Sequence, residues 1–358
     1  MKTPLSLRNN SKQKEEITIE TKRLNGNSDK DIVIAAEILK RGGLTAIPTE
    51  TVYGLAADAT NGAAVERIFK AKGRPQDNPL IVHIASYEQL KQLVSHIPEQ
   101  AKLLIEMFWP GPLTMILPKS NLVPDQVSAG LPTVAVRFPS HPVARAVIQA
   151  AGVPLAAPSA NISGSPSPTT AEHVLHDLDG KIDAVIDGGP CTVGLESTVI
   201  TLAEETPVLL RPGAVTLEQL QQVLGTVKIA DAVLHQLEQG SVVASPGMKY
   251  KHYAPKAKLI LLEGSDEAFV HYVNMHAEKG VAVLCYNGQE DCFHIPAIPY
   301  GKEDSPKEQA HQLFTALRKL DDLDCQLVYA KCPKSEGFSL AVYNRMIRAA
   351  GFEVQKLD

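Results

Sequence analysis

The stretch KGRPQDNPLIVHIA, residues 72–85, joins a basic segment to an apolar one. The apolar part, residues 80–85, has the length and composition of a buried β-strand. Residues 62–73 before it carry apolar side chains at helical spacing, and a second helical pattern covers residues 87–108. A buried strand between two helices is typical of α/β domains, so this stretch indicates an α/β fold.

The basic part of the same stretch predicts an anion site. Lys70, Lys72 and Arg74 occupy alternate positions. Gly73 and Pro75 favour an extended backbone, in which alternate side chains share one face, so we expect the three charges to converge. Arginine presents a planar fork to phosphate oxygens and lysine presents a point charge. The group therefore suits a phosphate ester.

Strands and helices continue to alternate on both sides of this stretch. Residues 28–43 begin with a serine cap and end on a glycine pair, which predicts a helix. Residues 44–58 predict a strand that is broken at Pro48. Further along the chain we expect a turn at 109–112, a strand at 113–118, a helix at 141–152 and a strand at 153–160.

A second unit follows a broken, aromatic segment, SPGMKYKHYAP, residues 245–255. From residue 258 onward the pattern is strand, helix, strand, helix, strand, helix, which predicts a small, open, Rossmann-like parallel α/β domain. We divide the chain into an N-terminal tail (1–24), a first α/β domain (25–225), a linker that could act as a lid (226–256) and a C-terminal α/β domain (257–358).

Composition excludes several classes of protein. The 358 residues include 35 basic and 40 acidic side chains, so the chain lacks the overall charge of a general nucleic-acid binder. No apolar run approaches the ~18 residues of a membrane span, and the N-terminus has no apolar signal region. We therefore expect a cytoplasmic protein that does not associate with a membrane. The five cysteines include no C-x-x-C pair, which argues against a zinc or disulfide framework.

Several short polar groups interrupt the apolar pattern. Ser159 and Asn161 follow a predicted strand, where open α/β folds usually bind ligands. Thr49, Thr51 and Tyr53 alternate and could line one wall of a cleft. Further along, Glu196, Ser197, Thr198 and Arg211 also stand beside apolar runs. The chain has no P-loop, dinucleotide fingerprint, zincin motif or hydrolase elbow, so the anion site must be built differently.

The order of these motifs resembles a known family. The segments PTETVYGL, KGRPQDNPLIVHIA, WPGPLT, VAVRFPSHP, APSANISG, GLESTVI and LLRPGA look like the YrdC-type domain of threonylcarbamoyl-AMP synthases. The linker and the small domain resemble the longer, two-domain form, and the resemblance covers roughly residues 25–358. It implies a YrdC-like twisted sheet domain with a concave cleft, followed by the parallel C-terminal domain.

The resemblance implies a reaction that joins L-threonine, bicarbonate or CO2, and ATP into threonylcarbamoyl-adenylate with release of pyrophosphate. A downstream threonylcarbamoyl transferase complex would then modify tRNA next to the anticodon, and this chain could meet tRNA transiently. A carbamate oxygen would attack the α-phosphate, and such a step needs positioning and charge stabilisation rather than a protein nucleophile.

The same resemblance assigns residues. The catalytic group would be Lys72, Arg74, Ser159 and Asn161. The nucleotide would contact Arg74, Asn78, Thr133, Ser159, Ser167 and Arg211, and Tyr250 of the linker would cover it. Threonine would contact Thr51, His83, Arg137, Ser197 and the backbone at Ala157. Magnesium is implied as a partner of the phosphates, with Glu50 and Glu196 as the acidic residues that could bind it.

Two other functions fit the sequence less well. A basic, concave α/β domain could bind double-stranded RNA without making an adenylate, but the acidic overall balance offers little surface for phosphates. A carbamoyl-transfer maturation factor contains a related domain, but such proteins carry additional zinc-finger segments, and this chain has no C-x-x-C pair.

Overall fold

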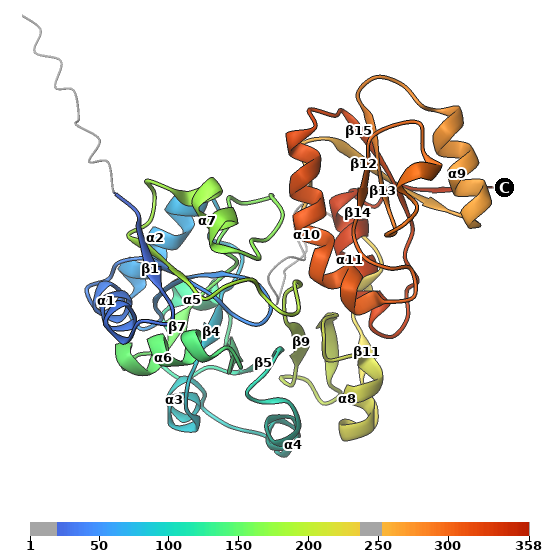
Figure 1. Cartoon of the computed structure of the whole chain (residues 1–358). Coiled ribbons are helices and arrows are strands. Elements are labelled where there is room, and N and C mark those ends of the chain that lie inside the picture. The colour runs from blue at the N-terminus through green and yellow to red at the C-terminus, as the bar shows by residue number, and fades with distance from the viewer. Residues whose placement is uncertain (1–19, 237–252, 358) are drawn as a thin grey trace, which may run out of the picture.

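The computed structural model describes residues 20–236 and 253–357. They form two α/β units that lie side by side (Figure 1). Each unit has its own sheet, as the alternation of strands and helices predicts. None of the helices in the described ranges combines the length and the apolar character needed to cross a bilayer.

The first unit contains a mixed sheet. Its strands are β1 (Lys22–Asn25), β2 (Thr45–Ile47), β3 (Gly54–Asp58), β4 (Ile81–His83), β5 (Leu113–Pro118), β6 (Thr133–Arg137), β7 (Leu155–Ala156), β8 (Ala184–Asp187), β9 (Thr198–Thr201), β10 (Val208–Arg211) and β11 (Lys228–Ile229). Their order in the sheet is β1-β8-β2-β3-β7-β4-β6-β5-β9-β10-β11. Strands distant in sequence are therefore neighbours in the sheet.

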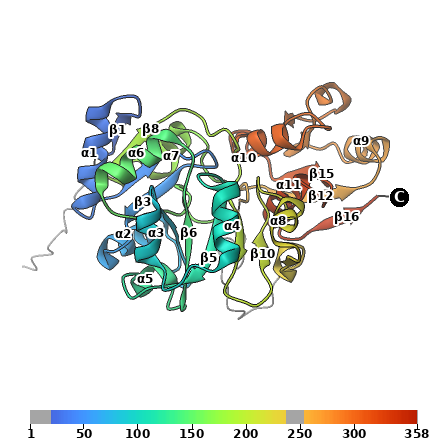
Figure 2. The same ribbon diagram turned by 90° about the horizontal axis from the view of Figure 1, so that it is seen from below.

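Helices cover this sheet. They are α1 (Asp29–Lys40), α2 (Gly62–Lys72), α3 (Tyr87–Leu93), α4 (Glu99–Phe108), α5 (Asp125–Ser128), α6 (Pro142–Ala151), α7 (Ala171–Leu178) and α8 (Leu217–Leu224). Successive strand residues belong to different cores: Ala46 packs in one apolar cluster and Ile47 in the other. This alternation is that of a strand buried on both faces. Figure 2 shows the first unit from below.

The predicted helix at 28–43 is confirmed, because Ser28 caps α1 by accepting the N–H of Asp31 at 3.3 Å. The single helix predicted for residues 87–108 is wrong. The chain forms α3 and α4 instead, separated by an irregular segment in which Val94 and Pro98 have extended backbone angles. Proline at the start of α4 supplies no side-chain cap but fits the first turn of a new helix.

The extended backbone predicted for residues 70–74 is also wrong. Helix α2 continues to Lys72 and ends on Gly73, whose φ of 61° is left-handed. Lys70 therefore points to solvent while Lys72 is buried, so the three charges do not share one face. Lys72 and Arg74 are nevertheless both buried, because the glycine cap turns the chain back toward the protein after Lys72.

The second unit is an open parallel sheet, as predicted. Its strands are β12 (Lys258–Glu263), β13 (Val281–Cys285), β14 (Ala297–Pro299), β15 (Leu327–Lys331) and β16 (Val354–Lys356), in the order β14-β13-β15-β12-β16. Its helices are α9 (Asp266–Met275), α10 (Pro306–Asp322) and α11 (Ser339–Ala349). Short 3-10 turns occupy Asp231–Val233 and Glu290–Cys292.

The two units share an apolar interface. Figures 1 and 2 both place α10 and α11 on the side of the second unit that faces the first. Val52 and Leu195 of the first unit belong to the same buried cluster as the core of the second. Tyr253, at the end of the linker, joins this cluster and packs against Phe314 of α10, with 5.3 Å between the ring centroids. The second unit is thus packed against the first.

Candidate active site

One pocket collects most of the predicted site residues. It is lined by Thr49, Thr51, Val52, Gly54, Arg74, Ile81, His83, Arg137, Ala157, Pro158, Ser159, Glu196, Ser197, Arg211 and Tyr253. These residues come from the ends of strands β3, β4, β6 and β10 and from loops that are far apart in sequence. The sheet order explains this, because β7, β4 and β6 are neighbours.

One end of the pocket is built around Arg137. Parallel strands β4 and β6 end side by side, with His83 in register with Arg137. The guanidinium donates to Thr51 Oγ1 at 2.7 Å, and its Nη2 lies 2.7 Å from Glu50 Oε1. Both charged side chains are almost completely buried. This fixed cation with adjacent hydroxyl groups can bind a small carboxylate-bearing molecule.

His83 is a neutral side chain in this environment. It is 3% exposed, and burial together with the charge of Arg137 lowers its pKa to about 3. A neutral imidazole can offer one donor and one acceptor, and it can pack against a substrate without adding charge. The histidine therefore contributes shape and hydrogen bonding to the pocket at neutral pH.

The other end of the pocket is lined by Arg74 and Ser159, and Lys72 lies behind this lining. Its Nζ donates to the carbonyl oxygens of Ser159 and Asn161, both at 2.5 Å, and lies 3.4 Å from Asn161 Oδ1. Ser159 Oγ donates to the same Oδ1 at 2.5 Å. Burial lowers the pKa of Lys72 well below its usual value, and the nearby charge of Arg74 acts in the same direction. The lysine and the loop after β7 thus form one connected unit.

Arg74 completes this basic end. It is buried, and its Nη2 lies 3.4 Å from the carbonyl oxygens of Asn78 and Pro79. Asn78 is itself 2% exposed. Two buried cations beside a hydroxyl group and main-chain groups are suited to hold phosphate oxygens in a fixed geometry.

Between these two ends, the segment around Ser197 forms one wall of the pocket. Thr114 and Ser197 share a hydrogen bond of 2.8 Å between their hydroxyl oxygens. Arg211 donates from Nη2 to Ser197 Oγ at 3.1 Å and from Nε to the Ser197 carbonyl at 2.9 Å. Burial lowers the pKa of Arg211 to about 10, so it remains a cation at neutral pH. This wall adds a third arginine to the site.

Glu196 connects this wall to the second unit. One of its carboxylate oxygens accepts a hydrogen bond from Ser167, and the other accepts from Arg345 Nε of α11 at 2.8 Å. Burial alone would raise the pKa of Glu196, but Arg345 and Arg211 outweigh that effect and lower it. Arg345 also lies over the ring of Tyr253, with 5.7 Å between its Cζ and the ring centroid.

The structure brings together many, but not all, of the predicted residues. Thr51, Arg74, His83, Arg137, Ala157, Ser159, Ser197 and Arg211 line the pocket. Three further predicted residues do not line the pocket but contact residues that do. Lys72 and Asn161 contact Ser159, and Ser167 contacts Glu196. Thr133 begins β6 and Arg137 ends it, so the two stand about 13 Å apart along the strand. Tyr250 lies outside the described residues.

Sequence reasoning missed Tyr253 and Arg345. The prediction placed a tyrosine of the linker at the nucleotide, and Tyr253 of the same motif is the one that the structure describes in the pocket. Its φ of 65° is unusual for a residue with a side chain. Arg345 could have been found from its position in α11, where apolar residues Ala341 and Ala349 stand four positions before and after it.

The described residues offer no cluster of three acidic, histidine or cysteine side chains that could hold a metal ion. Glu50 and Glu196, the acids considered for magnesium, are each paired with an arginine. A carboxylate that faces a guanidinium is a poor ligand for a hard cation, which prefers several free oxygens. The carboxylates described here therefore do not fit a protein-held magnesium site, and we derive no step through one.

Comparison with known proteins assigns both units. A family model described as "Telomere recombination" matches residues 37–213. A second model, described as "Threonylcarbamoyl-AMP synthase, C-terminal domain", matches residues 215–351. Together they cover the first unit from the last turn of α1 to β11 and the second unit up to the end of α11, with α8 and β11 inside the second match.

Whole proteins of the same layout are similar to this chain. Threonylcarbamoyl-AMP synthases of Pyrococcus abyssi and Bacillus subtilis are both 46% identical, over 91% of this chain and over 96% and 95% of their own lengths. A crystal structure of P. abyssi Sua5 complexed with L-threonine matches with a TM-score of 0.87 and 45% identity, over 95% of this chain and 99% of that one. The chain therefore belongs to the threonylcarbamoyl-AMP synthase family, in its two-domain form.

Proposed function

We propose that this protein synthesises threonylcarbamoyl-adenylate from L-threonine, bicarbonate or CO2, and ATP, and releases pyrophosphate. The observation that carries the proposal is one pocket with two different ends. Arg137, Thr51 and His83 stand at one end, and Arg74 and Ser159, with Lys72 behind, stand at the other. An amino acid and a nucleotide can therefore meet within it.

Threonine binds at the Arg137 end in this proposal. The guanidinium attracts the carboxylate, while Thr51 and Ser197 offer hydroxyl groups that are already held by hydrogen bonds to Arg137 and Arg211. Neutral His83 and the backbone at Ala157 complete the contacts. Because these side chains are held before the substrate arrives, little conformational entropy is lost on binding.

ATP places its triphosphate at the Lys72 and Arg74 end. The amine of threonine takes up CO2 as a carbamate, and a carbamate oxygen attacks the α-phosphorus. A new P–O bond forms while the bond from that phosphorus to the bridging oxygen breaks, and the electron pair leaves with pyrophosphate. Lys72 and Arg74 stabilise the negative charge on the reacting and leaving phosphates, and Ser159 and Asn161 keep the lysine in place.

The remaining nucleotide contacts stay predictions. Arg211, Ser167, Asn78 and Thr133 would contact the other parts of ATP, and Tyr250 would close over them. Ser167 donates a hydrogen bond to Glu196, and the charge of Arg211 helps to lower the pKa of the same carboxylate, which supports a joint role. Magnesium enters this scheme only as the metal complex of ATP, as a substrate.

A downstream transferase would use the product on tRNA. A cytoplasmic place of action is favoured by the five free cysteines, which are typical of a reducing compartment. Neither point affects the chemistry of the pocket.

The test is a set of reactions with purified full-length protein in which one substrate is omitted at a time. Pyrophosphate release should require threonine, bicarbonate and ATP together. Release that persists without threonine, or an absence of release from folded protein, would overturn the proposal. An RNA-binding module would release no pyrophosphate, but would bind double-stranded RNA with an affinity that falls steeply with salt.

A further inference from the structure

Helix α10 of the second unit contacts the first unit along one face. His311, Thr315 and Arg318 share that face, because they are spaced by four and three residues. A Cβ atom at Gly194 would lie only 2.5 Å from the Cα of His311, so the helix backbone approaches that loop closely. Thr315 Oγ1 lies 3.3 Å from Thr169 Oγ1.

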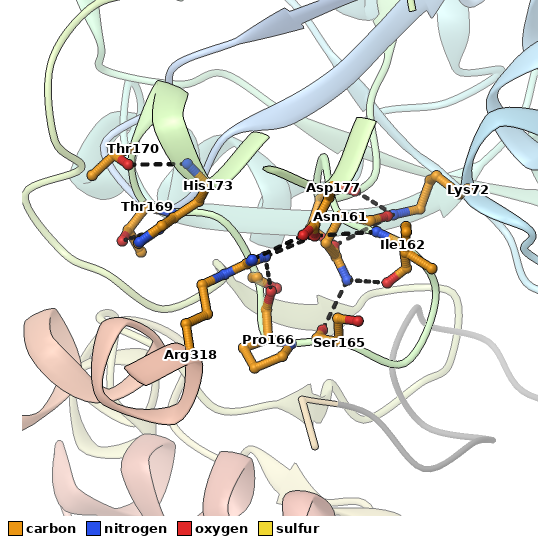
Figure 3. A network of polar contacts seen from close by, with 12 residues as sticks. Lys72, Asn161, Ile162, Ser165, Pro166, Thr169, Thr170, His173, Asp177 and Arg318 are labelled. Atoms are coloured by element: carbon orange, nitrogen blue, oxygen red, sulfur yellow. Dashed lines mark hydrogen bonds and ion pairs between the residues drawn. The ribbon is translucent and has the colours of Figure 1, made fainter. Parts of the chain in front are cut away.

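Arg318 makes the most directed contact of this face. Its Nη1 donates to Asp177 Oδ1 at 2.9 Å and its Nη2 donates to Asp177 Oδ2 at 2.8 Å. The same Nη2 donates to the carbonyl oxygen of Pro166 at 2.6 Å. The Arg318 and Asp177 side chains are only 12% and 6% exposed. Figure 3 shows Arg318 extending from the second unit to these two acceptors.

Both acceptors of Arg318 are connected to the loop that carries Ser159 and Asn161, because Pro166 follows this loop in the chain and Asp177 binds it. Asp177 Oδ2 also accepts the backbone N–H of Ile162 at 3.4 Å. The arginine therefore reaches the loop at two points, through Asp177 at residue 162 and directly at residue 166. A planar guanidinium with two fixed acceptors constrains both distance and orientation.

Asn161 connects this loop to the basic end of the pocket (Figure 3). Asn161 Nδ2 donates to the carbonyl oxygens of Ile162 and Ser165, both at 2.8 Å. Asn161 Oδ1 accepts from Ser159 Oγ, and Lys72 Nζ donates to the carbonyl oxygens of both residues. A shift at 162 or 166 would therefore move Asn161, and with it Ser159 and Lys72.

We propose that Arg318 is a positioning residue for adenylate synthesis, which holds the Ser159–Asn161 loop in its reactive geometry from the second unit. The inference rests on the proposed function. Arg318 does not line the pocket, so it acts through Asp177 and the loop. The other interpretation is that the ion pair only attaches the two units. Buried ion pairs are weak sources of stability, because desolvation offsets most of their attraction, whereas they fix geometry well.

The experiment compares four single variants and one double variant of the full-length protein with the wild type. Arg318→Met removes the guanidinium group, and Arg318→Lys keeps the positive charge but has fewer donors in fixed directions. Asp177→Asn removes the negative charge of the acceptor. Thr315→Val is the matched control, because it removes a contact from the same helix face that does not reach the loop. For each we measure kcat from pyrophosphate release, threonine affinity by calorimetry and the unfolding temperature.

We expect kcat of Arg318→Met to fall at least about tenfold, since small displacements of reacting groups are costly. Threonine affinity should stay within about threefold, because the Arg137 end does not depend on this loop. Arg318→Lys should recover part of kcat, and Thr315→Val should resemble the wild type. Combining Arg318→Met with Asp177→Asn should cost little more than the worse single change.

Two results would overturn the inference while leaving the proposed function intact. One is a wild-type kcat in folded Arg318→Met. The other is a parallel loss of kcat, threonine affinity and stability with no recovery in Arg318→Lys, which would make the pair a general support of the fold. If Arg318→Met does not fold, Arg318→Lys and Asp177→Asn decide by the same measurements. An inactive wild type would instead contradict the proposed function.

Discussion

Arg345 of the second unit and Glu196 of the first form a buried ion pair, with 2.8 Å between Nε and Oε2 and almost no exposure of either side chain. The same arginine donates to the carbonyl oxygens of Pro212 and Glu196 at 2.8 and 3.2 Å. Since Glu196 lines the pocket and also accepts a hydrogen bond from Ser167, the second unit supports one wall of the pocket from behind.

Removal of Arg345 should leave a buried carboxylate without its main partner. We expect Arg345→Met to lower the free energy of unfolding at pH 7 by about 3 to 5 kcal/mol. The double variant Arg345→Met, Glu196→Gln should be more stable than Arg345→Met alone, because it buries no isolated charge. Denaturant unfolding measures both. Equal stability of the single and double variants would show that the Glu196 charge does not depend on Arg345.

Arg74 is predicted to act on the reacting phosphates. Arg74→Ala should lower kcat/KM at least about a hundredfold, because removal of an oriented charge at a developing anion costs about 2 to 4 kcal/mol. Lys70→Ala is the matched control, since Lys70 precedes the same helix end but points to solvent. Initial rates of pyrophosphate release separate the two. If both variants keep the wild-type rate, the phosphates bind elsewhere.

The charge of Lys72 predicts a limit on the alkaline side of the pH profile. Burial and the positive charges of Arg74 and Arg318 lower its pKa, while the carboxylate of Asp177 raises it. If the ammonium form is the active one, activity is present below that lowered pKa and is lost as pH rises through it. Asp177→Asn should lower the pKa further and move this limit to lower pH.

The measurement is kcat/KM for wild type and Asp177→Asn at constant ionic strength from about pH 6 to 10, which lies below the ordinary pKa of lysine. An alkaline limit that stays at the same pH in the variant would show that Lys72 is not the group that titrates. The effect of Asp177→Asn on kcat at the optimal pH is a separate measurement, and it reports on the geometry of the Ser159–Asn161 loop.

Substrate choice should depend on the apolar part of the pocket. Val52, Ile81 and Ala157 line it beside the polar groups. If they contact the γ-methyl group of threonine, serine should react with a kcat/KM lower by about 10- to 200-fold, because one methyl group is worth about 1 to 3 kcal/mol. Competition of the two amino acids for limiting enzyme gives the ratio directly. Equal use of serine would place the methyl group in open solvent.

Local patterns predicted the elements that depend on local signals. Ser28 marks the start of α1, the helical pattern of residues 62–73 corresponds to α2, and β5 occupies residues 113–118 as the apolar run predicts. The same patterns failed in two ways. The helix predicted over residues 87–108 overlooked the local signal of Pro98, which starts a new helix, and β14 and β16 are too short to give a periodic signal.

The site shows the same limit. The resemblance supplied Lys72, Arg74 and Arg137, but not how they are held. His83 becomes a neighbour of Arg137 only through the pairing of β4 with β6. Arg318 has the sequence appearance of a solvated charge on a helix, and only the packing of α10 against the first unit brings it to Asp177. A contact between residues 141 positions apart gives no signal in the local sequence around either residue.

The most direct test of the central claim is the identity of the product. Purified protein is incubated with ATP, 15N-threonine and 13C-bicarbonate, and the nucleotide products are identified by mass spectrometry. The proposed reaction predicts an adenylate that carries both labels, formed in equal amount with pyrophosphate. An adenylate with the nitrogen label but without the carbon label would mean that the carboxylate of threonine itself is activated, and AMP or ADP without either label would mean simple hydrolysis. Either result would contradict the proposed reaction.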